Sequence, residues 1–190
     1  MNVVGLLLAA GSASRFGSDK LRHGLPHGVP IAVQSARHLR PQVSRVVAVT
    51  RSNEVKNLLE SEGCEAIVFA KADEGMGASL ACAARAAGRA DAYLVALADM
   101  PFVRPTSIAA VREALEKGAR LAAPYFRGRR GHPVGIAGTF FESLLDLHGD
   151  EGAKRLLREN ESQLVKVPVG DPGVIRDIDT PGDLAPPIAV

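Results

Sequence analysis

Short apolar runs alternate along this chain with segments whose composition favours helices. The first run, Val3–Ala10, is unbroken by polar residues, which predicts a strand buried on both faces of a sheet. Similar runs predict strands at Arg45–Thr50, Glu65–Ala70, Tyr93–Ala98 and Arg120–Phe126. Strands that alternate with helices in this way indicate an α/β fold, in which helices cover both faces of a parallel sheet.

Helix-forming segments fill the spaces between these strands. Ala78–Ala87 is the strongest of them, because alanine has the highest intrinsic helix propensity. The other expected helices are Ile31–Leu39 after Pro30, Asn53–Glu62 with Asn53 as its cap, and one that starts at Pro105. A last strand pattern follows at Leu164–Val169.

Composition narrows the class of protein. The chain has 190 residues, 46% apolar and 23% charged, which fits one globular domain with its own core. A net charge of +2 is too small to indicate a nucleic-acid or membrane-surface partner. The cysteines, Cys64 and Cys82, lack CxxC spacing, so a reducing cytoplasm is expected. The N-terminus has no basic stretch or cleavage pattern, and no apolar run reaches the ~18 residues that span a membrane.

The first expected strand opens into a loop with the sequence GSASRFGSDK. It holds two glycines, Gly11 and Gly17, and two cations, Arg15 and Lys20. Glycine lets backbone N–H groups approach phosphate oxygens closely, and nearby cations neutralise their charge. The loop is not a P-loop, because five residues separate its glycines and serine follows the second. The dinucleotide pattern GxGxxG is absent as well.

This stretch resembles LAAG-x-S-x-R-(M/F)-G-x-x-K, the signature of nucleotidyltransferases that activate sugars and cofactors. The resemblance implies catalytic roles for Arg15 and Lys20, which would offset charge on a triphosphate and on departing pyrophosphate. It also implies that the end of the strand binds nucleotide, through Leu8, Ala9, Ala10 and Gly11. The alternative is an ordinary strand-to-helix turn with surface cations.

A second glycine-containing segment, GMGASL, precedes the alanine-rich helix. A glycine-rich loop that opens a helix presents unpaired N–H groups to a ligand. The same family carries Gly-Met-Gly-x-Ser-Leu here, near the nucleotide base and ribose. The resemblance therefore adds Gly77, Ser79 and Leu80 to the nucleotide-binding residues. A plain helix entry is the alternative.

Asp99 follows the fourth expected strand, at the sheet edge where α/β proteins bind ligands. An unpaired buried carboxylate is costly, so Asp99 is expected to be exposed at the rim or to hold a cation. In the family the matching Asp of L-x-A-L-A-D-x-P binds Mg²⁺; a helix cap is the alternative. The closing motif DIDTPGDL implies Asp179 as the second metal ligand, with Gly182 where relatives carry Glu. Asp177 and Asp183 are expected at the surface or in caps.

The segment GRRGHPV resembles the matching segment of cytidylyltransferases that act on the molybdenum cofactor. That resemblance implies an acceptor site containing Arg129, Arg130, Gly131 and His132. His132 has an equal alternative as a packed structural histidine. A further family match, Gly-Asp-x-Gly-Ala, adds Asp150, which is expected to cap a helix there.

The resemblance implies one Rossmann-like, three-layer α/β nucleotidyltransferase domain over residues 1–190. Its sheet is expected to be mostly parallel, with one antiparallel excursion near Arg127–Ile136. The implied reaction is attack of an acceptor phosphate on the α-phosphorus of a nucleoside triphosphate, with Mg²⁺ held by Asp99 and Asp179 as cofactor.

Ala10 favours CTP among the nucleotides, because guanylyl-transferring relatives carry glycine at this position. The implied acceptor is a molybdopterin-type cofactor, and a molybdoenzyme is an implied recipient of the product. Two alternatives stay open: a relative that uses GTP or another NTP and a different phosphorylated acceptor, or a non-catalytic chaperone that binds nucleotide or cofactor.

Overall fold

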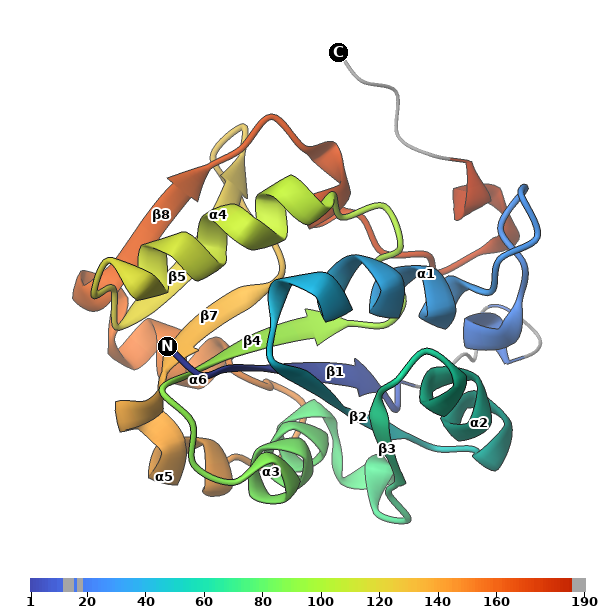
Figure 1. Ribbon diagram of the computed structural model, residues 1–190, viewed down its shortest axis with the longest axis horizontal. Coiled ribbons are helices and arrows are strands. Elements are labelled where there is room, and N and C mark those ends of the chain that lie inside the picture. The colour runs from blue at the N-terminus through green and yellow to red at the C-terminus, as the bar shows by residue number, and fades with distance from the viewer. Residues whose placement is uncertain (12–15, 17–18, 186–190) are drawn as a thin grey trace.

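The computed structural model describes residues 1–11, 16 and 19–185 of the chain. One mixed sheet runs through the molecule, with helices on both faces (Figure 1). The strands among the described residues are β1 (Val3–Ala9), β2 (Arg45–Thr50), β3 (Glu65–Val68), β4 (Ala92–Leu97), β5 (Leu121–Phe126), β6 (Arg129–Arg130), β7 (Val134–Ala137) and β8 (Leu164–Pro168). The three-layer α/β architecture expected from the sequence is confirmed.

Strands β1 to β4 form a parallel half of the sheet in the order β3-β2-β1-β4. Every residue of β1 is buried, since helices cover both of its faces, which accounts for the unbroken apolar run. Its side chains alternate between two cores, with Val3 and Leu7 in one and Val4 and Leu6 in the other.

The other half of the sheet contains the antiparallel strands. Strand β7 lies between β4 and β5 and runs antiparallel to both, while β6 pairs antiparallel with β5. Strand β8 then returns parallel to β5. The antiparallel excursion expected near Arg127–Ile136 is therefore confirmed, and it corresponds to β6 and β7.

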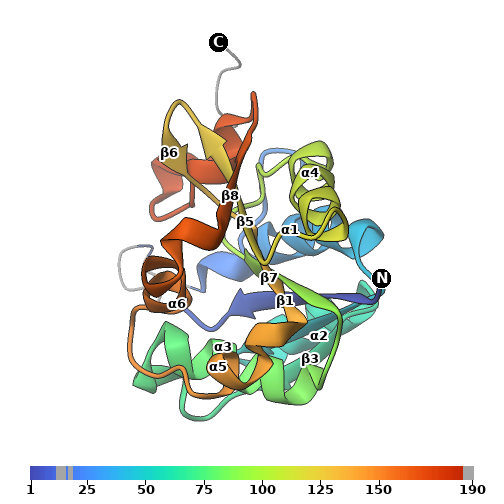
Figure 2. The same ribbon diagram turned by 90° about the vertical axis from the view of Figure 1, so that its left-hand side faces the viewer.

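Six helices complete the layers within the described ranges: α1 (Ile31–Leu39), α2 (Asn53–Ser61), α3 (Met76–Ala87), α4 (Pro105–Glu116), α5 (Phe141–Leu145) and α6 (Lys154–Glu159). Helices α1, α2 and α4 pack on one face of the sheet, and α3, α5 and α6 pack on the other (Figures 1 and 2). None of these helices is long and apolar enough to cross a bilayer.

Two helix starts differ from expectation by one or two residues. Ser52, and not Asn53, caps α2, because its Oγ accepts a hydrogen bond of 3.2 Å from the backbone N–H of Val55. Helix α3 begins at Met76 instead of Ala78, so the second glycine of GMGASL already lies within the helix.

The register of the central strands determines what meets at their carboxyl ends. Leu8 of β1 pairs with Leu97 of β4, and the backbone N–H of Ala98 donates to the carbonyl of Leu8 at 2.9 Å. The chain leaving β1 at Ala10 therefore lies beside the chain leaving β4 at Asp99. Parallel strands thus bring two predicted site segments to one edge of the sheet.

Candidate active site

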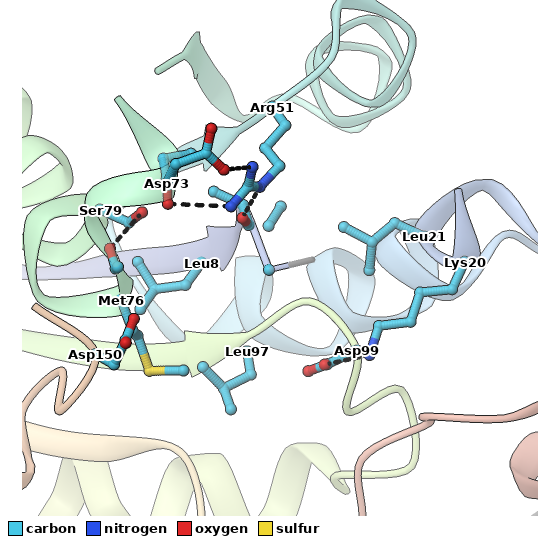
Figure 3. Close-up of a pocket in the computed structure, with 15 residues that line it drawn as sticks. Leu8, Lys20, Leu21, Arg51, Asp73, Met76, Ser79, Leu97, Asp99 and Asp150 are labelled. Atoms are coloured by element: carbon cyan, nitrogen blue, oxygen red, sulfur yellow. Dashed lines mark hydrogen bonds and ion pairs between the residues drawn. The ribbon is translucent and has the colours of Figure 1, made fainter. Parts of the chain in front are cut away.

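A cavity of about 450 Å³ opens at this edge of the sheet (Figure 3). Its lining comes from the ends of β1, β2 and β4, the turn at Lys20, the segment that enters α3, and Asp150. Leu8 and Leu97 contribute apolar surface between two polar ends. Lys20 and Asp99 lie at one end, whereas Ser79 and Asp150 lie at the other. Such a mixture of apolar surface and convergent polar groups is typical of small-molecule sites.

Lys20 occupies the centre of the charged end. Its Nζ donates to Asp99 Oδ2 at 2.9 Å, to the carbonyl of Ile178 at 2.8 Å and to Asp179 Oδ1 at 3.2 Å. Burial lowers the pKa of the Lys20 ammonium, but the charges of Asp99 and Asp179 and their hydrogen bonds outweigh it, so this pKa lies above its ordinary value. Asp99 therefore pairs with a cation of the same chain, and its role as a metal ligand stays a prediction.

Three carboxylates converge beside this lysine. Asp99, Asp177 and Asp179 each offer an oxygen within 4.8 Å of the others, a set that can hold a metal ion. Carboxylate oxygens are the ligands that Mg²⁺ and Mn²⁺ favour. Asp177 is exposed, as expected, but its place in this group was not predicted. Asp183 belongs to a capping box, in which its carboxylate accepts from the backbone N–H and the hydroxyl of the cap residue Thr180.

Arg51, the first residue after β2, connects two segments that line the cavity. Its guanidinium donates to the carbonyl of Ala10, to the carboxylate of Asp73, and to the carbonyl of Ala72 at 3.1 Å (Figure 3). A planar guanidinium suits such multiple contacts, because its donors point in fixed directions. The backbone that leaves β1 is thereby fixed against the turn that precedes α3.

The other end of the cavity is held by backbone packing. The N–H of Gly77 donates to the carbonyl of Gly149 at 2.7 Å. A Cβ on Gly77 would lie 2.5 Å from the carbonyl oxygen of His148, and a Cβ on Gly75 would lie 2.5 Å from Asp150 Oδ1. These glycines are therefore required by the chain's own loop, which packs against the start of α3.

Asp150 belongs to that loop and does not cap a helix. Helix α6 starts only at Lys154, and its cap position is Ala153, which makes no side-chain cap bond. The expectation of an Asp150 cap is wrong, because turns occupy residues 150–153 and separate Asp150 from the helix. Its carboxylate lines the cavity instead.

His132 lies in the layer beneath the site. Its Nδ1 is buried without a hydrogen-bond partner among the described residues, and the residue lines a small internal cavity together with Ser35 of α1 and Ile108 of α4. Burial lowers the pKa of His132 to about 4, so the ring is neutral at pH 7. This placement corresponds to the packed structural alternative, and the ring does not line the cavity.

Comparison with known proteins identifies the family. The model of the MobA-like NTP transferase domain matches residues 5–165 of the chain. The chain belongs to the MobA-like NTP transferase family. This match extends from within β1 to the first two residues of β8, and so includes every strand and helix that borders the cavity.

Relatives of this MobA-like protein match it over nearly the whole chain. The purine catabolism protein PucB of Bacillus subtilis is 28% identical over 94% of this chain and 92% of its own. The crystal structure of Rv0371c from Mycobacterium tuberculosis has a TM-score of 0.81, with 24% identity over 96% of this chain and 94% of that one. Molybdopterin-guanine dinucleotide biosynthesis protein A from Archaeoglobus fulgidus has a TM-score of 0.68, with 22% identity over 95% and 94% of the two chains.

Eight of the residues predicted from the MobA-like motifs line the cavity: Leu8, Ala9, Ala10, Gly11, Lys20, Ser79, Asp99 and Asp150. Asp179 lies next to it through Lys20. Leu80 does not line it, because its side chain is fully buried in the core between α3 and the sheet. Gly77 is held against the loop at 148–149, away from the lining. Arg15 lies outside the described residues, and its role stays a prediction.

The predicted acceptor segment also lies off the cavity. Arg129 and Arg130 form β6 and are both exposed, while Gly131 is buried, with its N–H bonded to the carbonyl of Pro124 at 2.8 Å. The charge of Arg130 acts on the ring of His132, as do those of Lys154 and Asp177. All three charged groups therefore act within electrostatic range of the buried His132 ring.

Sequence analysis missed Arg51, Asp73 and Asp177. Arg51 had one usable signal, since it is a cation directly after a buried parallel strand, at the ligand-binding edge. Asp73 had no sequence signal, because its partner, Arg51, lies 22 positions away in the chain. Asp177 had a usable signal as well, since it stands two residues before Asp179, and residues at that spacing in an extended segment share a face.

Proposed function

We propose that this chain is a CTP:molybdenum cofactor cytidylyltransferase, formed as one domain by the whole chain. The acceptor's terminal phosphate attacks the α-phosphorus of CTP in line, a bond to CMP forms, and pyrophosphate leaves with the electrons of the broken P–O bond. The observation that carries the proposal is the cavity itself. It brings the end of β1, Lys20, Ser79 and Asp99 together at the carboxyl edge of a parallel sheet.

The three carboxylates fit the divalent cation that the family implies. Their oxygens are close together, and the donor set contains only the hard ligands that Mg²⁺ and Mn²⁺ favour. Asp99 and Asp179 would hold the ion, with Asp177 beside them. When bound, such an ion neutralises phosphate charge near the reacting phosphorus.

For the rest of the reaction, the protein mainly has to position the two substrates and neutralise their charge. A phosphate nucleophile carries its own negative charge and needs no general base, and the described lining of the cavity contains no histidine. The backbone from Ala9 to Gly11 offers N–H groups to the nucleotide phosphates, and Lys20 offers a cation. Ser79, near the start of α3, lies at the opposite end, where the sugar and base would be bound.

Ala10 supports CTP as the nucleotide. Its side chain is buried, and its carbonyl accepts a hydrogen bond from Arg51. This part of the cavity lining is therefore held in place and cannot shift to make room for a larger base. GTP is the rival, since the relative from Archaeoglobus fulgidus is named for a guanine dinucleotide. That relative also supports a molybdopterin-type acceptor, and a molybdoenzyme would then receive the product.

The cations of the predicted acceptor segment support an anionic acceptor. Arg130 and Lys154 both act electrostatically on His132, and Arg129, the neighbour of Arg130 in β6, is exposed. Cations on this segment suit a phosphate monoester as the acceptor. In this proposal Arg129 and Arg130 bind the acceptor, and Gly131 and His132 support their strand.

Pyrophosphate release tests the proposal. The purified chain is incubated with Mg²⁺ and each of CTP, GTP, ATP and UTP, with and without molybdopterin cofactor. Release that requires both CTP and cofactor is expected, and the Asp99→Asn variant should slow it by ~10²-fold or more. Release with GTP alone among the nucleotides would favour the guanylyl alternative. No release with any nucleotide would favour a binding-only chaperone.

A further inference from the structure

The Lys20 ammonium has no hydrogen-bond donor left for a substrate. An ammonium has three N–H donors, and Lys20 uses them on Asp99, the carbonyl of Ile178 and Asp179. Its side chain is only 6% exposed. The residue expected to bind a triphosphate therefore already uses all of its donors on two carboxylates and one backbone carbonyl.

The same oxygens are those that would bind a metal ion. Asp99 and Asp179 belong to the three-carboxylate group, and Lys20 contacts both of them. An ammonium and a divalent cation that seek the same oxygens repel each other strongly in a partly buried site. The lysine and the metal therefore compete, and the long lysine side chain can turn away without movement of the backbone.

We propose that Lys20 is an exchangeable internal counter-ion. It holds Asp99 and Asp179 together in the absence of metal, and a divalent cation displaces it. The displaced ammonium then binds the triphosphate in the adjoining cavity, which Lys20 already lines. This last step rests on the proposed function, because it takes a nucleoside triphosphate as the ligand of that cavity.

The exchange makes the binding of metal and triphosphate cooperative. A metal that displaces Lys20 alone leaves a cation without its partners, whereas a triphosphate supplies new ones. The metal therefore binds weakly by itself and more tightly when a triphosphate is present. By linkage, the triphosphate gains affinity from the metal by the same factor.

Mn²⁺ binding without nucleotide tests the competition. Free Mn²⁺ is measured by electron paramagnetic resonance during titration of the wild-type chain, Lys20→Met and the control Lys56→Met. Lys56 is a matched control, because it also pairs with a carboxylate, Glu60, but on α2. Lys20→Met should bind Mn²⁺ at least ~10-fold more tightly than wild type, and Lys56→Met should bind as wild type does. Equal or weaker binding by Lys20→Met would overturn the proposal.

Wild-type protein provides a second test in case Lys20→Met does not fold. Amine acetylation followed by mass spectrometry should find Lys20 protected in EDTA. Excess Mn²⁺ should raise its labelling several-fold relative to Lys56, and inorganic tripolyphosphate added with the metal should protect it again. Unchanged Lys20 labelling, while Mn²⁺ binds at a site lost in Asp99→Asn, would overturn the exchange.

These tests separate the exchange from the proposed reaction. Neither measurement uses CTP or an acceptor, so an inactive turnover assay would leave a positive exchange result standing. Conversely, active turnover combined with unchanged Lys20 labelling would refute the exchange and leave the cytidylyl transfer in place.

Discussion

The two polar ends of the cavity are built by different forces. At one end, charges converge: Lys20 bridges Asp99 and Asp179 with hydrogen bonds of 2.9 and 3.2 Å. At the other end, backbone packs on backbone, and Gly77 bonds to Gly149 at 2.7 Å. The charged end can exchange one cation for another without a change of backbone. The glycine end has no room for an added side-chain atom, so it determines the shape of the cavity. The charged end can instead rearrange when a ligand binds.

Gly77→Ala should have the largest effect, because it breaks the rigid end. The added Cβ would meet the carbonyl of His148 at 2.5 Å, so the loop at 148–150 must move. We expect a stability loss of about 2–4 kcal/mol, at or above the usual range for overpacking. Displacement of the loop should also lower kcat/KM by ~10²-fold or more.

Chemical denaturation and steady-state kinetics measure both effects. Gly170→Ala is the control, since nothing lies within 4 Å of a Cβ there and its backbone is not left-handed. It should stay within about 0.5 kcal/mol of wild type. A Gly77→Ala protein as stable and as active as the control would show that the glycine end is not rigid.

Asp99→Asn and Asp150→Asn compare carboxylates at the two ends of one cavity. Asp99 is bonded to Lys20 and belongs to the acidic group, so its neutral analogue should lower kcat by ~10²-fold or more, the scale of losing one preorganised electrostatic contact. Asp150 lines the glycine end, and its analogue should change kcat by less than ~10-fold, with most of the effect on KM. Equal losses of kcat would remove the distinction between the two ends.

Arg51→Met should have an intermediate effect, because it loosens the connection between the segment that leaves β1 and the entry to α3. Loss of its bonds to Ala10 and Ala72 should raise the KM for nucleotide ~10-fold and cost about 1–2 kcal/mol of stability. Arg45→Met is a matched control. Arg45 starts the same strand and also bonds a carbonyl and a carboxylate, those of Ala87 and Glu65, away from the cavity. The control should lose comparable stability and keep its KM; a matching rise in its KM would assign the effect to general loosening.

Ala10→Gly should have the smallest effect, a change of selectivity. Removal of one buried methyl group should lower the ratio of kcat/KM for CTP over GTP by ~10-fold, mainly by admitting GTP. Ala9→Gly removes the same methyl group from the neighbouring position, whose side chain lies in the opposite core, and should leave the ratio unchanged. If the Ala10→Gly ratio is also unchanged, selectivity resides elsewhere, most plainly at Ser79 and the entry to α3.

The fold was largely predictable, because its strands are short buried runs with an unambiguous pattern. β1 and β4 were placed from apolar runs alone, and their parallel register then brought Ala10 and Asp99 together. The antiparallel strands followed from the family resemblance. The α2 cap was missed by one residue, since Ser52 and Asn53 are equally good caps in sequence.

The site was less predictable, because its contacts join residues far apart in the chain. Lys20 and Asp99 are 79 positions apart, and no local pattern indicates that the lysine contacts a carboxylate instead of a phosphate. The glycines of GMGASL were explained by ligand approach, but their close neighbour is the loop at 148–150. A glycine signals that something comes near, without indicating what.

The docking of Gly75 and Gly77 onto the loop at 148–150 limits how this enzyme's specificity can be exchanged with that of a relative. The entry to α3, which lines the cavity, and the loop that carries Asp150 share one backbone interface, with Gly77 bonded to Gly149. A loop transplanted alone would have to pack closely against Gly75 and Gly77 of a helix entry that belongs to a different loop. Chimaeras that exchange both segments together should fold. The two segments therefore have to be exchanged as a pair, although more than 70 residues of chain separate them.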